Sequence, residues 1–146
     1  MRKEKKEIIT EMEEKKKTIS VVCALIEEQG KIFAAQRGYG PWKDWWEFPG
    51  GKIEPGETPR EAIIREIREE LAVTIEPTED LGTIAWDYPD FHLSMRAFRA
   101  KIVQGRLSLL EAEDGRWLEK EALSLLHFLP ADEALLANLR KRAGWE

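Results

Sequence analysis

Three glutamates near the middle of the chain have the spacing of side chains that share one face of a helix. Glu66, Glu69 and Glu70 stand at positions i, i+3 and i+4 in the run REIREE. Carboxylates at this spacing repel one another and weaken a helix by about 0.2–0.5 kcal/mol per pair. A divalent cation bound between the carboxylates would turn this repulsion into attraction, because Mg²⁺ binds oxygen ligands and bridges them to substrate phosphates. On its own the run favours a solvated acidic face paired with Arg65 and Arg68. The surrounding sequence must therefore show whether the glutamates form such a face or a metal site.

The spacing around these glutamates is more specific than the run itself. Five residues separate Gly51 from Glu57, and seven more separate Glu57 from the run REIREELAV at 65–73. Over these 23 residues the chain resembles the signature of the Nudix hydrolases, nearly position for position. The one departure is Ala72, where the family pattern has a glycine that serves the helix exit and favours a left-handed backbone. We expect Ala72 to cost some stability or to shift the turn, without removing a catalytic group.

The resemblance implies a fold, a reaction and a set of roles. The implied fold is an α/β/α sandwich with a mixed β-sheet. The implied reaction is the attack of water on a nucleoside diphosphate linked to another group, assisted by Mg²⁺ or Mn²⁺. The implied metal ligands are the carboxylates of Glu66, Glu69 and Glu70 and the backbone carbonyl of Gly50. Glu66 would also be the general base, and Glu57 would pair with Arg65 to brace the loop against the helix.

The similarity extends over about residues 18–140. The chain looks like the MutT-type branch, whose members cleave nucleoside triphosphates to the monophosphate and pyrophosphate. The stretch WWEFPGGKIEPGET at 45–58 carries the likeness. The segment KIFAAQR ends in Arg37, where the branch has an arginine that contacts the substrate. The segment LPADEALLANL at 129–139 resembles the base-recognition segment, with Asp132 at the position that reads the edge of the base.

Two further positions are candidates for the site. Glu111, six residues before Trp117, matches an extra carboxylate near the metals, although Glu113 and Asp114 compete for that role. Phe48 is placed at the substrate site, and its position also fits a residue of the hydrophobic core.

The substrate implied by the resemblance depends mainly on Asp132. Asp132 fits the N-cap of a closing helix over 133–142 as well as a base-reading residue, just as Arg37 fits a plain surface charge. A carboxylate accepts from exocyclic amines such as that of cytosine, and when protonated it also donates. We therefore expect a (d)NTP, with equal support for (d)CTP or 5-methyl-dCTP and for 8-oxo-dGTP. The alternatives are a hydrolase of ADP-ribose or of a dinucleoside polyphosphate, and a nucleotide-binding module without activity, which would typically lack the carboxylates present here.

The helix that must position the glutamates has clear signals at its start. Thr58 is a good N-cap, Pro59 suits the first helical position, and Glu61 completes a capping box. We expect the helix to run from Pro59 to about Leu71. Its apolar positions fall in one sector that would face the core: Ile63, Ile64, Ile67 and Leu71.

The rest of the chain alternates strand patterns with turns and short helices. Extended segments are predicted at 18–26, 31–37, 73–75, 79–88, 91–102 and 115–121, and a short helix at 121–126. A turn around Pro89-Asp90 would join two of these strands into a hairpin. Because strands outnumber helices and helices punctuate them, we expect one domain over 18–146, with a mixed sheet flanked by helices. Residues 1–17 read as a charged N-terminal lead-in, helical or disordered.

The length, composition and net charge of the chain limit the classes of protein to which it can belong. The chain has 146 residues, with 42% hydrophobic and 35% charged, which suits one domain with a sizeable core. No apolar run approaches the roughly 20 residues of a membrane span, and the single cysteine, Cys23, fits a buried thiol in a cytoplasmic protein. The net charge of −5 argues against stable nucleic acid binding. A small phosphorylated ligand held through metal ions remains compatible, and we expect a monomer or weak homodimer.

Overall fold

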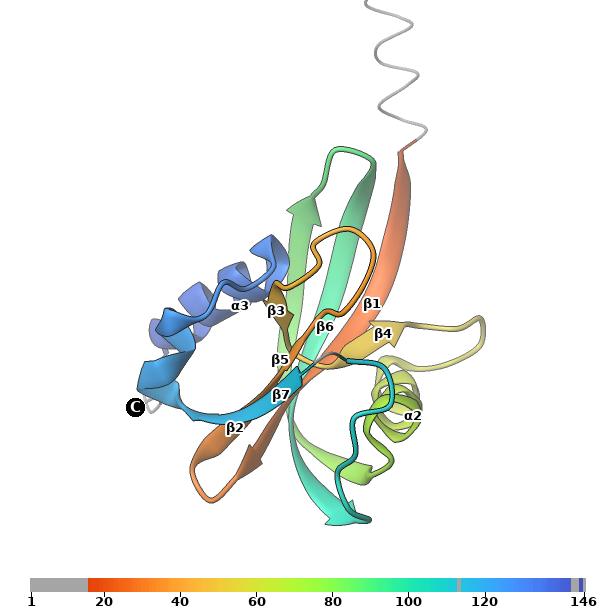
Figure 1. Ribbon diagram of the computed structural model, residues 1–146. Coiled ribbons are helices and arrows are strands. Elements are labelled where there is room, and N and C mark those ends of the chain that lie inside the picture. Colours follow the sequence, from red (N-terminus) through yellow and green to blue (C-terminus); the bar gives the residue numbers. More distant parts are fainter. Residues whose placement is uncertain (1–15, 113, 143–144, 146) are drawn as a thin grey trace, which may run out of the picture.

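The described strands form a seven-stranded mixed sheet (Figure 1). The computed structural model describes residues 16–112, 114–142 and 145. The elements in chain order are β1 (Lys17–Glu28), β2 (Lys31–Gln36), β3 (Trp46–Glu47), β4 (Gly50–Lys52), α2 (Pro59–Leu71), β5 (Thr74–Asp87), β6 (Phe91–Gln104), β7 (Asp114–Glu119), the 3₁₀ helix η1 (Lys120–Leu125) and α3 (Pro130–Arg140). Residues 1–15 lie outside the described residues, so the lead-in expected over 1–17 stays a prediction, apart from Lys17, which begins β1.

The central strand β1 explains why the sheet is mixed. The strand order is β3-β2-β1-β6-β5, with β4 also paired to β1 and β7 to β2. β1 runs parallel to β6 from Lys17 opposite Phe91 to Ile26 opposite Ala100. It is antiparallel to β4 and to β2. The expected mixed sheet is confirmed.

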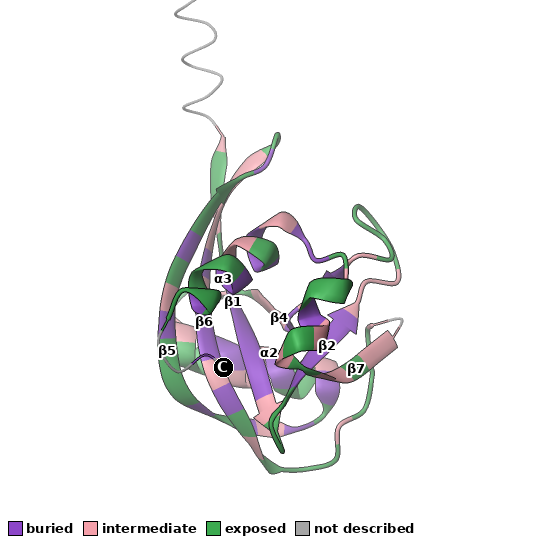
Figure 2. Cartoon of the chain, turned by 90° about the vertical axis from the view of Figure 1, so that its left-hand side faces the viewer, coloured by how far each residue is buried: buried purple, intermediate pink, exposed green. Residues whose placement is uncertain are grey.

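Helices α2 and α3 lie on opposite sides of the sheet, which gives three layers (Figure 1). Alternate residues of β1 enter two separate cores, because successive side chains of a strand point to opposite faces. Cys23 and Leu25 join the core beneath α3, whereas Val22 and Ala24 join the core beneath α2. Figure 2 shows buried positions running along β1 and β2, with exposed positions on the outer sides of the helices. The expected α/β/α sandwich is therefore confirmed.

Helix α2 begins and ends where its sequence signals predict. The side chain of Thr58 accepts from the backbone N–H of Glu61, and the side chain of Glu61 accepts from the backbone N–H of Thr58, which completes the capping box. Its apolar stripe is buried at Ala62, Ile63, Ile67 and Leu71. Ala72 follows with a left-handed backbone, φ 60°, and donates its N–H to the carbonyl of Arg68. The position therefore keeps the backbone shape that favours glycine.

Two predicted boundaries were wrong. The segments predicted at 73–75 and 79–88 form one strand, β5, which stays paired with β6 across register shifts such as the one between Pro77 and Glu79. Helix α3 begins at Pro130, and its N-cap is Leu129 rather than Asp132. The hairpin predicted around Pro89-Asp90 is present between β5 and β6. No helix in the described ranges is long and apolar enough to cross a membrane.

Candidate active site

Arg65, in the middle of α2, ties the helix to the loop that precedes it. Its Nε lies 2.6 Å from Glu57 Oε2 and its Nη2 lies 2.9 Å from Glu57 Oε1. Nη2 also donates to the carbonyl of Lys52 at 3.0 Å, and Glu57 accepts from the backbone N–H of Glu54 at 2.9 Å. The hydrogen bonds from Arg65 and Glu54 lower the pKa of Glu57 to about 2. Glu57 is therefore ionised at neutral pH and holds the loop, in the pairing that the sequence predicts.

The third nitrogen of Arg65 reaches two other signature glutamates. Nη1 donates to Glu66 Oε1 at 2.9 Å and to Glu69 Oε2 at 3.1 Å. The Glu69 side chain is more than half exposed, at 55%, so its carboxylate lies at the surface beside Arg65. The Glu66 side chain is 15% exposed, and its desolvation raises the pKa of its carboxyl. Arg65 thus holds Glu66 in place from one side.

The backbone of Gly50 lies very close to strand β1, and the backbone of Gly51 lies very close to the Glu66 carboxylate. A Cβ at Gly51 would lie 2.4 Å from Glu66 Oε2, and a Cβ at Gly50 would lie 1.9 Å from the carbonyl oxygen of Val22. Any larger residue would displace either β4 or the Glu66 carboxylate. The pair of glycines in the sequence is therefore required by close approach.

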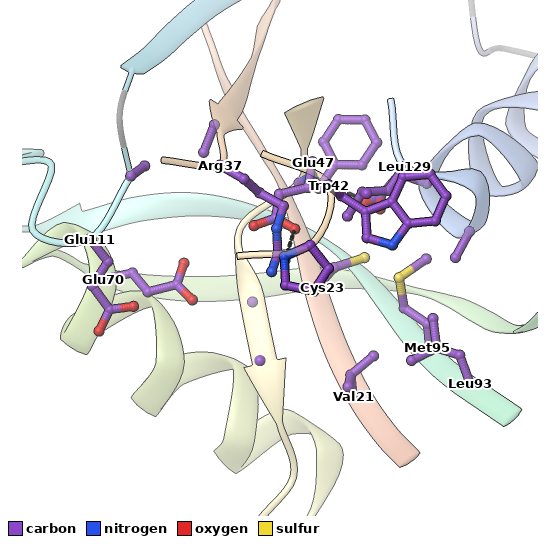
Figure 3. Close-up of a pocket in the computed structure, with 18 of the residues that line it drawn as sticks. Val21, Cys23, Arg37, Trp42, Glu47, Glu70, Leu93, Met95, Glu111 and Leu129 are labelled. Carbon is purple, nitrogen blue, oxygen red and sulfur yellow. Dashed lines mark hydrogen bonds and ion pairs between the residues drawn. The ribbon is translucent and has the colours of Figure 1, made fainter. Parts of the chain in front are cut away.

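Glu70 lies near three other acidic side chains, those of Glu47, Glu66 and Glu111. Burial is the main cause that raises its pKa to about 9, and the nearby carboxylates of Glu47, Glu66 and Glu111 add to the effect. Figure 3 shows Glu70 and Glu111 side by side at one end of the cavity. The carboxylates gathered around Glu70 disfavour its ionised form, and oxygen donors of this kind are those that Mg²⁺ prefers.

The loop that carries Glu111 is docked on the end of α2. The backbone N–H of Ser108 donates to the carbonyl of Leu71 at 2.9 Å, and that of Leu110 donates to the carbonyl of Glu70 at 3.1 Å. Carbonyls of the last helical turn, which have no partner within the helix, are thereby satisfied. The next residue, Glu111, lines the cleft.

Of the competitors for the role of Glu111, Asp114 has other partners. Its Oδ1 accepts from the backbone N–H of Gly115 at 2.8 Å, and its Oδ2 lies 3.4 Å from Arg116 Nε. Glu113 lies outside the described residues. Within the described ranges, no three His, Cys, Asp or Glu side chains already stand together as a metal-binding group. The ligand set expected from the sequence consists of oxygen donors, which suit a divalent cation, and the assignment of these ligands stays a prediction.

The cleft beside these carboxylates has a volume of about 430 Å³ and two chemically different ends. Glu70 and Glu111 mark one end in Figure 3. Apolar side chains mark the other: Trp42, Leu93, Met95 and Leu129. A ligand with a charged part and a planar, less polar part would match this division.

Arg37 and Asp132, both expected at the substrate site, line the same cleft. Arg37 Nη1 forms an ion pair with Glu47 Oε2 at 3.1 Å. Asp132 is 5% exposed, and its Oδ1 accepts from the backbone N–H of Phe48 at 3.1 Å. Burial, followed by the charge of Glu47, raises the pKa of Asp132 to about 8. Asp132 is therefore a buried carboxyl group of the cleft, and its predicted role as the N-cap of α3 was wrong.

Phe48 belongs to the hydrophobic core, and its expected role at the substrate site stays a prediction. Its side chain is buried, with its ring stacked on Phe128 at a centroid distance of 5.0 Å, and it also lines the cleft.

Comparison with known proteins settles the family. The NUDIX domain matches residues 16–140. The chain belongs to the Nudix family. An 8-oxo-dGTP diphosphatase of Escherichia coli strain K12 is 31% identical over 127 residues, which cover 86% of this chain and 98% of that protein. A CTP pyrophosphohydrolase of the same strain is 44% identical over 94 residues, which cover 56% of this chain and 70% of that protein.

Solved structures have the same fold. The solution structure of the E. coli ORF135 protein has a TM-score of 0.74 and 33% identity, and the match covers 86% of this chain and 93% of that one. A MutT Nudix hydrolase from Burkholderia pseudomallei has a TM-score of 0.77 at 23% identity, over 84% of this chain and 98% of that one, and supports the fold.

The Nudix signature did not reveal every residue of the cleft. Glu47 forms an ion pair with Arg37, and its charge raises the pKa of the buried Asp132. Burial raises the pKa of Glu47 itself, yet no motif in the sequence assigns it a role. The available signal was a carboxylate three residues before the Gly-Gly turn. Trp42 and Tyr88 also line the cleft, and no sequence signal separates them from core aromatic residues.

Proposed function

We propose that this Nudix protein is a metal-dependent nucleoside triphosphate pyrophosphohydrolase that releases a nucleoside monophosphate and pyrophosphate. The observation that carries the proposal is the two-ended cleft. Glu70 and Glu111 lie at one end, and a buried carboxyl, Asp132, lines the same cavity as the apolar side chains of the other end. The relatives named 8-oxo-dGTP diphosphatase and CTP pyrophosphohydrolase support the same reaction.

The metal would be held at the carboxylate end. The proposed ligands are Glu66, Glu69, Glu70, Glu111 and the carbonyl of Gly50. Glu69 would join the others by exchanging its contact with Arg65. Bound Mg²⁺, or Mn²⁺, would neutralise phosphate charge and make water a better nucleophile.

The chain itself would orient the reacting groups and accept a proton. Glu66 is the proposed general base, because desolvation already raises its pKa and Arg65 fixes its position. Glu57 holds Arg65, so its contribution is to position the base. Arg37 would contact the substrate near the phosphates or the sugar, after exchanging its ion pair with Glu47.

The base would be recognised at Asp132, with Phe48 beside it. A carboxyl group whose pKa is raised to about 8 is mostly protonated at neutral pH, and it then both donates and accepts hydrogen bonds. This capacity suits cytosine and 8-oxoguanine alike, so (d)CTP, 5-methyl-dCTP and 8-oxo-dGTP are the proposed substrates. The corresponding cellular role is removal of unwanted nucleotides before DNA synthesis, in the cytoplasm, by a monomer or weak homodimer.

The test is steady-state kinetics in Mg²⁺ with a panel of substrates: 8-oxo-dGTP, dGTP, dCTP, 5-methyl-dCTP, ADP-ribose and a dinucleoside polyphosphate. The proposal predicts the highest kcat/KM on a triphosphate. A preference for ADP-ribose or the dinucleoside polyphosphate would replace the proposed substrate class. Tight nucleotide binding without turnover of any compound would instead indicate a binding module.

A further inference from the structure

The loop at 38–45, between β2 and β3, is closed at its neck by hydrogen bonds. The backbone N–H of Arg37 donates to the carbonyl of Trp45 at 3.0 Å, and the N–H of Asp44 donates back to the carbonyl of Arg37 at 2.9 Å. The side-chain amide of Gln36 donates to the carbonyl of Asp44 at 3.0 Å. Inside the loop, the N–H of Trp45 donates to the carbonyl of Trp42 at 3.1 Å. These bonds hold the conformation of the loop body.

Trp42 has an uncommon backbone conformation within this loop. Its φ is 66°, in the left-handed region that a bulky residue rarely adopts. Strained backbone of this kind persists where the surroundings hold it, and it concentrates at functional sites. The Trp42 residue lines the cleft and is still 39% exposed.

Aromatic neighbours fix the orientation of the Trp42 indole. Trp45 packs against it edge to face, with ring centroids 4.7 Å apart, and Tyr88 does so at 6.0 Å. Trp45 is itself stacked on His127 at 3.7 Å. The hydroxyl of Tyr88 accepts from the backbone N–H of Ala131 at 3.3 Å. Tyr88 therefore connects Trp42 to the first turn of α3, next to Asp132.

The Trp42 indole and the carboxylates of Glu70 and Glu111 lie at different ends of the cleft. Figure 3 shows Trp42 beside Leu129, on the side of the cavity that holds Met95, whereas Glu70 and Glu111 lie at the opposite side. A large ring that is held rigidly and left partly uncovered in a cleft presents a flat apolar surface to a ligand. A planar nucleobase is the part of a nucleotide that matches such a surface.

We propose that Trp42 is a base-binding residue whose indole stacks on the nucleobase while Asp132 reads the edge of that base. The proposal rests on the proposed function, because it requires a nucleotide in the cleft. Stacking tolerates every base, since each base has a π-face. Trp42 would therefore set the requirement for a base, and Asp132 would select among bases.

The test compares ligands with and without a base, by calorimetric titration of the full chain with dCMP, 8-oxo-dGMP and 2-deoxyribose 5-phosphate. The variants are Trp42→Ala and Trp42→Phe. The matched control is Trp86→Ala, because Trp86 is also a partly exposed tryptophan, at 40%, and lies on β5 away from the cleft-lining set.

Trp42→Ala should weaken binding of both nucleoside monophosphates by about tenfold or more, which corresponds to about 1.4 kcal/mol, and should leave binding of the sugar phosphate unchanged. Trp42→Phe should retain most of the affinity, and Trp86→Ala should match the wild type. The ratio of affinities for the two monophosphates should stay constant in Trp42→Ala and should change in Asp132→Asn.

Monophosphate affinity of Trp42→Ala within about twofold of the wild type would overturn the stacking role. So would an equal loss for 2-deoxyribose 5-phosphate, since that result marks a structural effect on the loop. A wild-type protein that binds the monophosphates but hydrolyses no triphosphate would overturn the proposed reaction and leave the stacking role standing. A wild-type protein that hydrolyses a triphosphate but binds neither monophosphate more tightly than 2-deoxyribose 5-phosphate would overturn the stacking role and leave the proposed reaction standing.

Discussion

Glu66 and Glu57 are both bound to Arg65, and their surroundings give them different roles. Glu66 is mostly covered and its pKa is raised, which suits a proton acceptor. Glu57 accepts hydrogen bonds from Arg65 and from a backbone N–H, and its pKa is lowered to about 2, which suits a permanent anion. The same residue type is thus suited to the proposed proton transfer at one position, and it holds the loop at the other.

Glu66→Gln should lower kcat by at least about 100-fold, because a general base contributes roughly 10²–10⁴ to the rate. KM should change much less, since a base acts mainly in the transition state. Steady-state kinetics on the preferred triphosphate provides the measurement. A variant that retains most of the wild-type kcat would show that Glu66 is not the base, and Glu111→Gln would then be examined.

Glu57→Gln should lower the melting temperature as well as the rate. The neutral amide loses the charge that pairs with Arg65, and the loop at 52–57 loosens from α2. Thermal unfolding and kinetics on the same preparation provide the measurement, with Glu54→Gln as the control, because Glu54 lies farther from Arg65, at 3.6 Å, with a side chain that is 61% exposed. Unchanged melting with a rate loss as large as that of Glu66→Gln would mark Glu57 as catalytic.

At the scale of elements, local signals predicted α2 well and α3 poorly. The boundaries of α2 depend on residues within the helix and next to it, namely the capping box at Thr58 and Glu61 and the exit at Ala72. The start of α3 has no side-chain cap, and Pro130 occupies its first turn. Similarly, β5 is continuous because β6 pairs along its whole length, which a search for isolated strand patterns does not detect.

Ala72→Gly should stabilise the protein. Ala72 is exposed and left-handed at φ 60°, where its Cβ costs about 1–2 kcal/mol and glycine has no such cost. The greater freedom of glycine in the unfolded chain offsets part of this gain, so the free energy of unfolding should rise by about 0.5–1 kcal/mol. Urea unfolding measures the change. A lower unfolding free energy for Ala72→Gly would show that the helix exit is not strained.

At the scale of the whole molecule, the fold collects acidic groups along one cleft, from the buried Asp132 to the half-buried Glu47 and Glu70 and the exposed Glu111. The sequence predicted the part of this site that lies within the 23-residue signature, because those side chains are brought together by one loop and one helix. The partners of Asp132 come from distant segments: Phe48 donates to it, and the charge of Glu47 raises its pKa. Such contacts depend on tertiary packing, so the sequence assigned Glu47 no visible role and left Asp132 with two interpretations, a base-reading residue and an N-cap.

The buried Asp132 should make stability fall as the pH rises. Its pKa increases from the ordinary 3.8 to about 8 on folding, so between about pH 4 and pH 8 the folded state holds a proton that the unfolded state has released. The free energy of unfolding therefore decreases across this window, by at most about 1.4 kcal/mol per pH unit from this group. The raised pKa of Glu70 acts in the same direction.

Asp132→Asn removes this contribution while keeping an oxygen that accepts from Phe48. In urea unfolding at pH 5 and pH 8, with a chelator present, the wild type should lose more stability between the two pH values than the variant does. Parallel losses in the two proteins would show that Asp132 is ionised in the folded state throughout this range.

The most direct test of the central claim is ³¹P NMR of the reaction products, with the preferred triphosphate incubated in Mg²⁺ or in excess chelator. We predict a nucleoside monophosphate and pyrophosphate in Mg²⁺ and no turnover in the chelator, because the acidic end of the cleft otherwise repels the polyphosphate. Release of orthophosphate with a nucleoside diphosphate, or undiminished turnover in the chelator, would contradict the account.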